Sequence, residues 1–496
     1  MSHKHTNALV DPVDQSLLNR LRAATELLES IAVQRSLLEH IPVHDRKRFH
    51  KAIADVYNPD PIARRRMVKA AERERTALRA QRVDAVLDQT GIRTLRRKPV
   101  FVSPNVFAPE DFDRLESIPE AEPQHCYICK EKFSAVHHFY DQMCPPCAEF
   151  NFRKRSELAD LRGRVALLTG GRVKIGYQAG LKLLRSGAQL IVTTRFPCDC
   201  AQRYAREPDF SQWSDRLQIF GLDMRQPAAV ESLCKHLLQT RPRLDFIVNN
   251  ACQTVRRPPE FYAHMMDGER TARAEMPSAA GGLLGTCAGA LTPAHTIAAA
   301  ELSQVPLLPE DLLGSPSLFP RGRLDQDLQQ IDLRDRNSWR LLMAEVSTVE
   351  LLEVQLINAI APFIINAHLK PLMLRTPERD KHIVNVSALE GQFYRHRKTT
   401  RHPHTNMAKA ALNMMTRTSA ADYQGDGIHM NSVDTGWVTD EDPVEIARRK
   451  VVEQRFHPPL DIIDGAARIV DPIIEGANTG NHVWGQFLKD YRPADW

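Results

Sequence analysis

The sequence predicts an α/β protein whose larger part is a doubly wound parallel sheet of Rossmann type. A short apolar run, Arg164–Thr169, leads into a glycine-bearing turn and then into a helical pattern that continues to Leu184. Two further strand-like runs, Leu217–Leu222 and Asp245–Val248, each lead directly to polar residues. Strands that alternate with helical segments are typical of parallel sheets, and polar residues at the strand ends indicate a site along one sheet edge.

The length of the chain, 496 residues, exceeds what one compact core holds, so we expect two or more domains. We divide the chain into a helical N-terminal region over 1–97, a connector with a small cysteine module over 98–158, and the Rossmann domain over 159–496. A long insertion at about 255–335 interrupts the Rossmann domain.

The composition of the chain argues against a membrane-spanning protein, a secreted protein and a nucleic-acid partner. The hydrophobic fraction of 43% is ordinary for a globular protein, and the sequence has no run of about 18 apolar residues that would predict a membrane span. The first residues lack the apolar core of a secretory signal, so we predict a cytoplasmic protein. The formal net charge of +5 is small for this length and does not favour nucleic acid as a partner.

Residues 13–91 are predicted to be helical, because apolar residues recur there at steps of three and four. The apolar face of the first helix consists of Leu17, Leu18, Leu21, Ala24, Leu28 and Ile31. The next long segment, Ile62–Leu87, is rich in arginine, but acidic residues are interleaved with the cations. This mixture favours a solvated helix face over a nucleic-acid surface. The helical region is also a candidate surface for a protein partner.

A cluster of cysteines gives the chain its clearest metal signal. Two Cys-x-x-Cys turns lie fourteen residues apart, and their members are Cys126, Cys129, Cys144 and Cys147. Each turn directs two sulfur atoms to one point, and two such turns complete a tetrahedral zinc site. Four thiolates close the coordination sphere, so we predict a structural zinc. The segment resembles treble-clef or ribbon-type zinc modules, which makes it a second candidate surface for a protein partner.

The insertion separates the strand that ends at Val248 from the next predicted long helix, Trp339–Leu369. Its middle part, Met276–Arg321, is rich in alanine, glycine, proline and leucine. Such a long connection is either a lid over a substrate or a flexible surface segment, and the sequence leaves both interpretations open.

The turn Gly170–Gly176 places backbone N–H groups and a helix N-terminus where a dinucleotide pyrophosphate can bind. Together with Asp223 and with Asn249-Asn250-Ala251, this turn resembles the short-chain dehydrogenase/reductase family. In that family the turn reads Thr-Gly-x-x-x-Gly-x-Gly, and the fourth strand ends in Asn-Asn-Ala-Gly. The resemblance runs from about Leu161 to the C-terminus, apart from the insertion.

The resemblance implies a nucleotide-binding role for Thr169, Gly170, Gly171, Lys174, Ile175 and Gly176. Lys174 replaces the middle glycine of the motif, where a lysine adds a mobile positive charge for phosphate. The alternative is a turn that no longer binds a nucleotide and persists as part of the fold. The resemblance also implies that Asp223 contacts adenine and that Asn249 braces the fourth strand against the cofactor.

The choice between NADP and NAD is usually set after the second strand of such a domain. Here the strand that begins at Gln189 ends in Arg195 and lacks the acidic residue that would hold the ribose 2′-hydroxyl of NAD. A guanidinium suits a 2′-phosphate. We therefore predict NADP as the cofactor, with NAD less favoured.

Members of this family use Asn, Ser, Tyr and Lys in catalysis, and the chain retains only part of that set. Asn358 matches the asparagine, and Lys409 matches the lysine, which the resemblance also places on the cofactor ribose. Thr405 stands at the tyrosine position, and Ala388 stands at the serine position beside Ser387. An aliphatic hydroxyl cannot be tuned toward neutrality as a phenol can. The catalytic motif is therefore degenerate.

The loop before Lys409 is rich in cations and imidazoles, and it suggests other proton donors. His404 or Tyr394 could take over acid/base work, since histidine titrates near neutrality. The alternative is a solvated basic loop. After the sixth strand, Thr439 is expected to meet the nicotinamide.

The resemblance implies an NADP-dependent oxidoreductase that transfers hydride to or from a carbonyl, hydroxyl or related small-molecule substrate with an altered proton donor. The alternative is a catalytically silent NAD(P)-binding scaffold or sensor whose zinc module recruits a protein partner. The retained Asn358 and Lys409 favour the first interpretation, and the missing tyrosine favours the second. We also expect a homo-oligomer.

Overall fold

The computed structural model describes residues 15–57, 61–96, 121–275, 278–285, 299–312, 317–320, 322–324, 330–394, 398–439, 441–455 and 457–496. The chain divides into two compact units, Met1–Asp84 and Ala85–Trp496. The predicted connector lies largely outside the described residues, as does much of the middle of the insertion.

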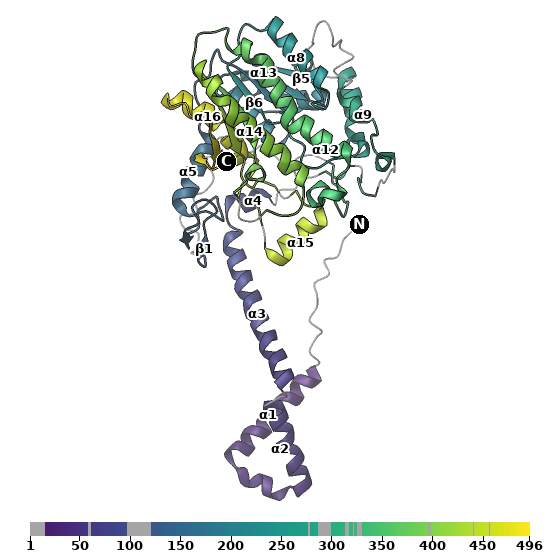
Figure 1. Cartoon of the computed structure of the whole chain (residues 1–496). Coiled ribbons are helices and arrows are strands. Elements are labelled where there is room, and N and C mark those ends of the chain that lie inside the picture. The colour runs from purple at the N-terminus through teal and green to yellow at the C-terminus, as the bar shows by residue number, and fades with distance from the viewer. Residues whose placement is uncertain are drawn as a thin grey trace. The chain divides into compact units, whose positions relative to one another are not determined.

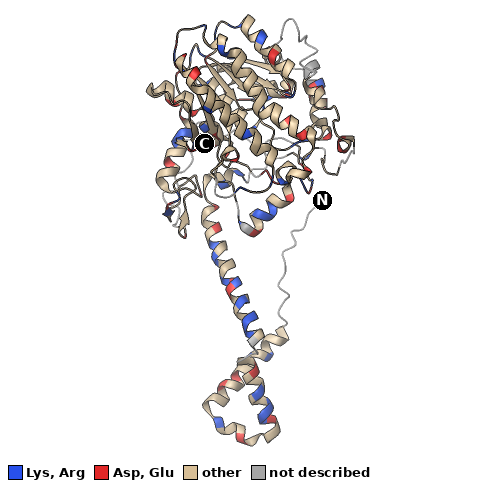
Figure 2. Ribbon diagram, in the orientation of Figure 1, with Lys and Arg blue, Asp and Glu red and all other residues tan. Residues whose placement is uncertain are grey.

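The first unit consists of helices, which confirms the predicted helical N-terminal region. It contains α1 (Gln15–Val33), η1 (Arg35–His40), α2 (Val43–Tyr57) and most of α3 (Pro61–Leu87). No residue of α1, η1 or α2 is buried, so these helices build no core of their own. Figure 2 shows cations along α3 with acidic residues interspersed.

The second unit is built on an eight-stranded sheet in the order β10-β9-β8-β7-β6-β3-β4-β5. All neighbouring strands are parallel except β9 and β10. Because the strand order runs outward in both directions from β3, the sheet is doubly wound, and the predicted fold class is confirmed. The strands are β3 (Val165–Thr169), β4 (Gln189–Thr194), β5 (Leu217–Gly221), β6 (Phe246–Asn249), β7 (Lys381–Ser387), β8 (Ile428–Asp434), β9 (Phe487–Lys489) and β10 (Arg492–Ala494).

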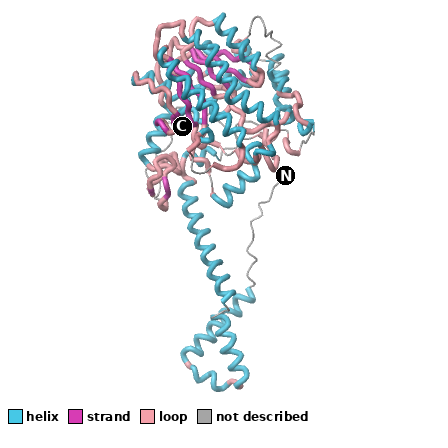
Figure 3. Tube along the Cα trace, in the orientation of Figure 1, coloured by secondary structure: helices cyan, strands magenta, loops and turns pink. Residues whose placement is uncertain are grey.

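Helices cover both faces of this sheet, which forms a central layer in Figures 1 and 3. Alternate residues of β3 enter opposite cores, as a pleated strand requires: Leu168 packs with α6 and α16, and Leu167 packs with α8 and α13. The helices are α6 (Lys174–Arg185), α7 (Pro197–Ala205), α8 (Pro227–Thr240), α12 (Thr348–Gln355), α13 (Ala361–Met373), α14 (Pro403–Gly425), α15 (Val444–Gln454) and α16 (Ile462–Thr479). Short turns are η2 (Phe210–Gln212), η3 (Ser214–Arg216) and η8 (Leu389–Gly391).

One continuous helical stretch, Thr348–Met373, is long and apolar enough to cross a membrane by length and composition. It consists of α12, the π-helical turn η7 (Leu356–Ile360) and α13. Its α13 part packs against α8, and Ile365 and Leu369 are buried in the core. The buried amides of Asn358 and Asn366 also hydrogen-bond within the protein. These contacts identify the stretch as a core helix of the α/β unit.

The cysteine-bearing segment packs directly on the α/β part. It contains β1 (Gln124–His125), β2 (Lys132–Phe133) and α5 (Pro145–Ser156), and its apolar cluster includes Tyr140 and Met143 together with Leu460 and Ile462. Ile92 of α4 (Gly91–Arg96) enters the same cluster. The division of the chain at residues 97 and 158 stays a prediction.

The described parts of the insertion begin with α9 (Pro259–Glu275) and α10 (Ser278–Gly281), both of which pack against α7. A later described part of the insertion contains the short turn η4 (Pro309–Leu312). The long helix predicted to begin at Trp339 begins at Thr348, and the turns η5 (Ser338–Arg340) and η6 (Met343–Glu345) precede it. The start of the insertion is therefore an ordered helix beside the carboxyl end of β4.

Candidate nucleotide-binding site and metal centre

The glycine turn after β3 has no room for side chains at two positions. Gly170 has a φ of +70°, and a Cβ added there would lie 2.9 Å from Cα of Ala251. A Cβ on Gly176 would lie 2.2 Å from the carbonyl oxygen of Gly170. The turn therefore keeps the close backbone approach on which a dinucleotide fingerprint depends, and α6 begins directly after it.

Lys174, which stands at the position of the motif's middle glycine, has a left-handed backbone conformation. Its φ of +55° lies in a region that a residue with a Cβ occupies at a cost of about 1–2 kcal/mol. The turn therefore holds a lysine in a conformation that glycine adopts without this cost.

A cavity of about 370 Å³ opens at the carboxyl ends of the central strands. The glycine turn forms one wall, and the ends of β4 and β5 and the segment after β6 form others. The cavity also meets α9 through Phe261 and Tyr262, and the loop after β8 through Val438 and Thr439. In doubly wound sheets, ligands bind in the crevice at the carboxyl ends of the strands, where the strand order reverses.

Asn250 holds the glycine turn in place. Its backbone N–H and that of Ala251 both donate to Oγ1 of Thr169 at 3.0 Å. Its Nδ2 donates to the carbonyl oxygens of Thr169 and Gly170, each at 3.1 Å. The bracing role that the resemblance implied for Asn249 is therefore shared with Asn250, the second of the paired asparagines.

Asn249 points away from this cavity into a buried amide cluster. Its Nδ2 donates to Oδ1 of Asn366 at 2.8 Å and to Oδ1 of Asn385 at 2.9 Å. These bonds tie β6 to α13 and β7. Asn249 therefore fixes the position of the fourth strand in the core, and Asn250 faces the site.

Arg195 and Asp223 line the cavity at the ends of β4 and β5. Arg195 donates from Nη2 to the hydroxyl oxygen of Tyr262 at 2.8 Å. Asp223 is buried and pairs with Arg225 at 2.7 Å. Burial would raise the pKa of Asp223, but the Arg225 and Arg195 guanidinium groups outweigh it and lower that pKa below its ordinary value. The carboxylate therefore stays ionised beside the cavity.

Ile175 and Thr439 also line the cavity, as the sequence analysis expected for residues near a cofactor. Oγ1 of Thr439 donates to a carboxylate oxygen of Glu441 at 2.8 Å, and Glu441 lines the same wall. Gly171 lies behind the turn, where an added Cβ would meet Val192 at 2.8 Å.

Asn358 lies in the π-helical turn η7 and forms hydrogen bonds to the segment that follows β6. Its Oδ1 accepts from the backbone N–H of Gln253 at 2.8 Å, and its Nδ2 donates to the Gln253 carbonyl at 3.1 Å. Gln253 lines the cavity. Asn358 therefore shapes the wall of the cavity through Gln253 without lining it, and π-turns of this kind often mark functional positions.

Lys409 and Thr405 lie one turn apart on the buried face of α14. Nζ of Lys409 donates to the carbonyl oxygen of Val386 at 2.7 Å. Oγ1 of Thr405 is buried and has no hydrogen-bond partner among the described residues. Neither residue lines the cavity described above.

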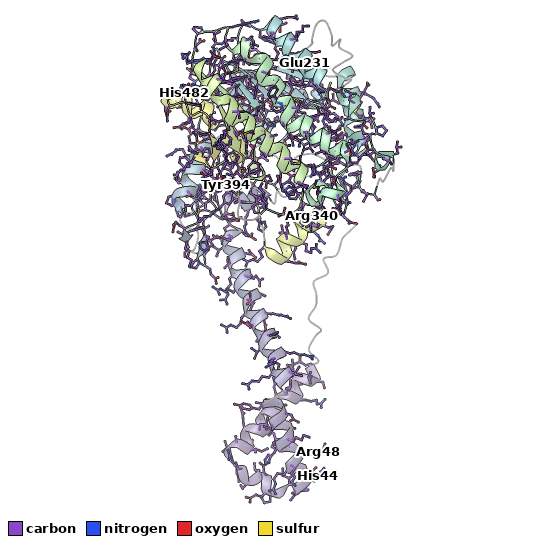
Figure 4. All side chains as sticks on the ribbon, viewed as in Figure 1. His44, Arg48, Glu231, Arg340, Tyr394 and His482 are labelled. Atoms are coloured by element: carbon purple, nitrogen blue, oxygen red, sulfur yellow. The ribbon has the colours of Figure 1, made fainter. Side chains whose placement is uncertain are left out.

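The other candidate proton donors are engaged or remote. Oγ of Ser387 donates to Oδ1 of Asn413 at 2.6 Å on the α14 side of β7. Nε2 of His404 lies 3.3 Å from Oε1 of Glu350, in an orientation that makes no hydrogen bond. Burial would raise the pKa of Glu350, but His404 and Ser338 lower it. Tyr394, labelled in Figure 4, is 84% exposed.

The segment that follows the insertion covers the N-terminus of α14. The ring of Trp339 stacks on that of His402 at a centroid distance of 3.8 Å and an angle of 4°. The backbone N–H of His402 donates to the carbonyl oxygen of Leu341 at 2.8 Å. Burial lowers the pKa of His402 to about 4, so this ring is neutral at physiological pH. His404 and Thr405 are consequently 2% and 3% exposed.

The four predicted metal-binding cysteines converge on one point. The sulfur atoms of Cys126, Cys129, Cys144 and Cys147 all lie within 4.8 Å of one another. The Sγ atoms of Cys129 and Cys144 are 3.7 Å apart. A tetrahedral site with Zn–S bonds of about 2.3 Å has sulfur–sulfur edges of about 3.8 Å. The donor set therefore fits a structural zinc ion.

A second acidic group in the described residues does not resemble a cation site. Glu157, Asp471 and Glu475 lie close together, but Nζ of Lys154 lies among them at 2.8, 2.9 and 2.6 Å. The ammonium group supplies the positive charge there. These contacts also attach α5 to α16.

Comparisons with known proteins show what the α/β part resembles. The short chain dehydrogenase family matches residues 164–271, and the enoyl-(acyl carrier protein) reductase family of the same type matches residues 337–458. The two matches flank most of the insertion. They support a relationship of this part of the chain to the short-chain dehydrogenase/reductases.

Individual relatives extend the comparison. An uncharacterized protein of Acanthamoeba polyphaga mimivirus is 29% identical over 393 residues, which cover 76% of this chain and 77% of that protein. This share is larger than residues 159–496 make up, so the similarity reaches into the part before residue 159. A bovine dehydrogenase/reductase, SDR family member 13, is 32% identical over 123 residues, 23% of this chain and 29% of that protein.

Solved structures also resemble the chain. The RhlG/NADP active-site complex of Pseudomonas aeruginosa matches with 18% identity and a TM-score of 0.41 over 66% of this chain and 95% of that chain. A short chain dehydrogenase from Burkholderia cenocepacia in complex with NADP matches with 16% identity and a TM-score of 0.42 over 66% and 97%.

Proposed function

We propose that this chain is an NADP-dependent oxidoreductase of short-chain dehydrogenase/reductase type that acts on a carbonyl, hydroxyl or related small-molecule substrate with an altered proton donor. The observation that carries the proposal is the preserved glycine cradle, in which Gly170 and Gly176 leave no room for a Cβ beside a cavity of about 370 Å³. Without side chains at these two positions, the backbone of the turn can come close to a pyrophosphate.

Different residues around the cavity would bind different parts of NADP. The backbone from Gly170 to Gly176 and the N-terminus of α6 would bind the pyrophosphate. Asp223 would contact the adenine, and Thr439 lies on the wall assigned to the nicotinamide. Bound NADP would supply the hydride-transferring nicotinamide to the reaction.

Arg195 supports NADP over NAD. It stands directly after β4, lines the cavity, and follows two threonines in place of an acidic residue. A carboxylate at this point would repel a 2′-phosphate, and a guanidinium attracts it with charge-assisted hydrogen bonds.

The proton-transfer side is the part that departs from the family. Lys409 would anchor the ribose and raise the local positive charge, but its Nζ now bonds the carbonyl of Val386. An aliphatic hydroxyl such as that of Thr405 is a poor proton donor, so His404, which is close to Glu350, is our candidate for the proton donor. Ser387 would serve only if its bond to Asn413 opened.

A second candidate function is a catalytically silent NAD(P)-binding scaffold or sensor. One observation favours it: Asn358, Ser387, His404, Thr405 and Lys409 do not line the cavity, and all five are buried. In this alternative the zinc module or the N-terminal helices recruit a protein partner. Both candidates keep the cytoplasmic location and the homo-oligomeric state as proposals.

One sequence of measurements separates the two functions. NADPH is titrated into the full chain, and the loss of absorbance at 340 nm is then followed with a panel of aldehydes and ketones. Binding with oxidation that depends on the carbonyl supports the enzyme. If NADPH binds but is not oxidised with any of the carbonyl compounds, the scaffold function is supported. If NADPH does not bind, both functions are rejected.

A further inference from the structure

The first helix of the insertion is attached to the cofactor side of the sheet through a buried carboxylate. Glu269 of α9 accepts hydrogen bonds from the backbone N–H groups of Cys198 at 3.1 Å and Asp199 at 2.9 Å. These are donors of the first turn of α7, where a carboxylate also interacts favourably with the helix dipole. Glu269 is 8% exposed, so this contact fixes α9 relative to the end of β4.

This attachment places Tyr262 against Arg195. The hydroxyl oxygen of Tyr262 accepts from Nη2 of Arg195 at 2.8 Å, and the guanidinium lies 4.6 Å from the centre of the Tyr262 ring. The ring of Phe196 is 5.4 Å from that of Tyr262 and 5.8 Å from the guanidinium. Arg195 is therefore held by the two rings and by one hydrogen bond.

Tyr262 also faces the cavity. It lines the same wall as Arg195 and Asp223, which is the side assigned to the adenosine part of the nucleotide. The hydroxyl group can donate one hydrogen bond as well as accept one. No acceptor for its proton is present among the described residues, and the Tyr262 side chain is only partly buried.

We propose that Tyr262 is a specificity residue for the 2′-phosphate of NADP: it orients the Arg195 guanidinium and donates its hydroxyl proton to a phosphate oxygen. This inference rests on the proposed function and adds a second residue to the single arginine visible in the sequence. It also assigns the start of the insertion to cofactor recognition, which neither interpretation of the insertion from the sequence included.

A double-mutant cycle on the full chain tests the proposal. The dissociation constants of NADPH and NADH are measured by fluorescence titration for the unmodified protein, Tyr262→Phe, Arg195→Ala and the double variant. Tyr262→Phe should weaken NADPH binding by more than about 10-fold, the effect of one hydrogen bond to a charged group, and change NADH binding by less than about 2-fold. The double variant should bind NADPH more weakly than Arg195→Ala, because the Tyr262 hydrogen bond to the phosphate is also lost. Its loss of affinity should stay below the product of the two single losses, because Tyr262 also orients Arg195.

Tyr57→Phe is the matched control, since this tyrosine of α2 is 83% exposed and does not line the cavity. Equal weakening of NADPH and NADH by Tyr262→Phe would indicate a packing role and overturn the inference. An unchanged NADPH affinity would overturn it as well, with the proposed function intact. Absence of dinucleotide binding in the unmodified protein would overturn the proposed function together with the inference.

Discussion

The hydroxyl oxygen of Tyr127, beside the first metal-binding cysteine, accepts a hydrogen bond from the backbone N–H of Trp437 at 3.1 Å. Trp437 precedes Val438 and Thr439, which line the cavity, and Val438 also belongs to the apolar cluster of the cysteine module. The module therefore supports one wall of the candidate nucleotide site from behind.

We expect Tyr127→Phe to weaken NADPH binding several-fold, because the loop after β8 loses its hydrogen bond to the module. The cost in unfolding free energy should be about 1 kcal/mol, the usual contribution of one such bond. Urea unfolding and a fluorescence titration measure the two effects. An unchanged NADPH affinity together with the expected loss of stability would show that the loop holds its position without Tyr127.

Zinc removal tests the module itself. Cys144→Ser should reduce bound zinc from one ion per chain to substoichiometric levels, because three thiolates leave the tetrahedral site incomplete. Cys252→Ser is the control, since Cys252 lies outside the cluster. Metal analysis after gel filtration measures the zinc content. A metal-free unmodified protein that had been expressed with adequate zinc would contradict this prediction.

The sequence predicted the fold class and part of the cavity wall, because both depend on local patterns. Strands, the glycine turn and Arg195 follow one another along the chain, so periodicity and motif spacing indicate them. Tyr262 and Glu269 lie in a segment whose composition suggests only a loop, and their roles depend on contacts with Arg195 and α7. Single-sequence patterns do not contain such long-range pairings.

The catalytic helix shows the same limit. The spacing of Thr405 and Lys409 correctly indicated one buried helix face. The stacking of Trp339 on His402, which covers that face, joins residues 63 positions apart and has no local signal. The sequence showed Asn249 and Asn250 as one motif. In the structure Asn249 bonds within the core and Asn250 bonds the glycine turn, and this difference depends on the direction in which each side chain leaves β6.

Asp434 gives the protein a pH-dependent stability term. Burial, with the nearby charges of Asp490 and Glu390, raises the pKa of its carboxyl group from 3.8 to about 6. The folded state therefore binds more protons than the unfolded state between these values, and stability from this group is lost as the pH rises through 6. Asparagine does not ionise, so the Asp434→Asn variant lacks this pH dependence. The unfolding free energy of the variant minus that of the unmodified protein should be about 2 kcal/mol larger at pH 8 than at pH 4.

Denaturant unfolding of both proteins at the two pH values measures that difference. The Asn side chain can still accept from the backbone N–H of Leu389 or Gly436, which Asp434 contacts at 3.2 Å. A difference in unfolding free energy that does not change with pH would mean that Asp434 ionises normally in the folded protein.

Variants of Lys409 and Thr405 distinguish the enzyme function from the scaffold function. If hydride transfer occurs, Lys409 anchors the nicotinamide ribose and sets the charge near the proton donor, whereas Thr405 offers a hydroxyl that is a poor acid. Lys409→Ala should then weaken NADPH binding and reduce turnover by about 100-fold, the lower range for loss of an acid–base group. Thr405→Val, which removes the hydroxyl and keeps the branched shape, should reduce turnover less than about 10-fold.

The two variants must be compared in folded protein, because Lys409 also bonds the Val386 carbonyl and its loss leaves that acceptor buried. Lys409→Met keeps most of the aliphatic volume and serves as the control for packing. If Thr405→Val abolishes turnover and Lys409→Ala spares it, the roles assigned on α14 are reversed. If both variants bind NADPH like the unmodified protein and none of the three oxidises it with any carbonyl, Lys409 is only a brace between α14 and β7, and the scaffold function stands.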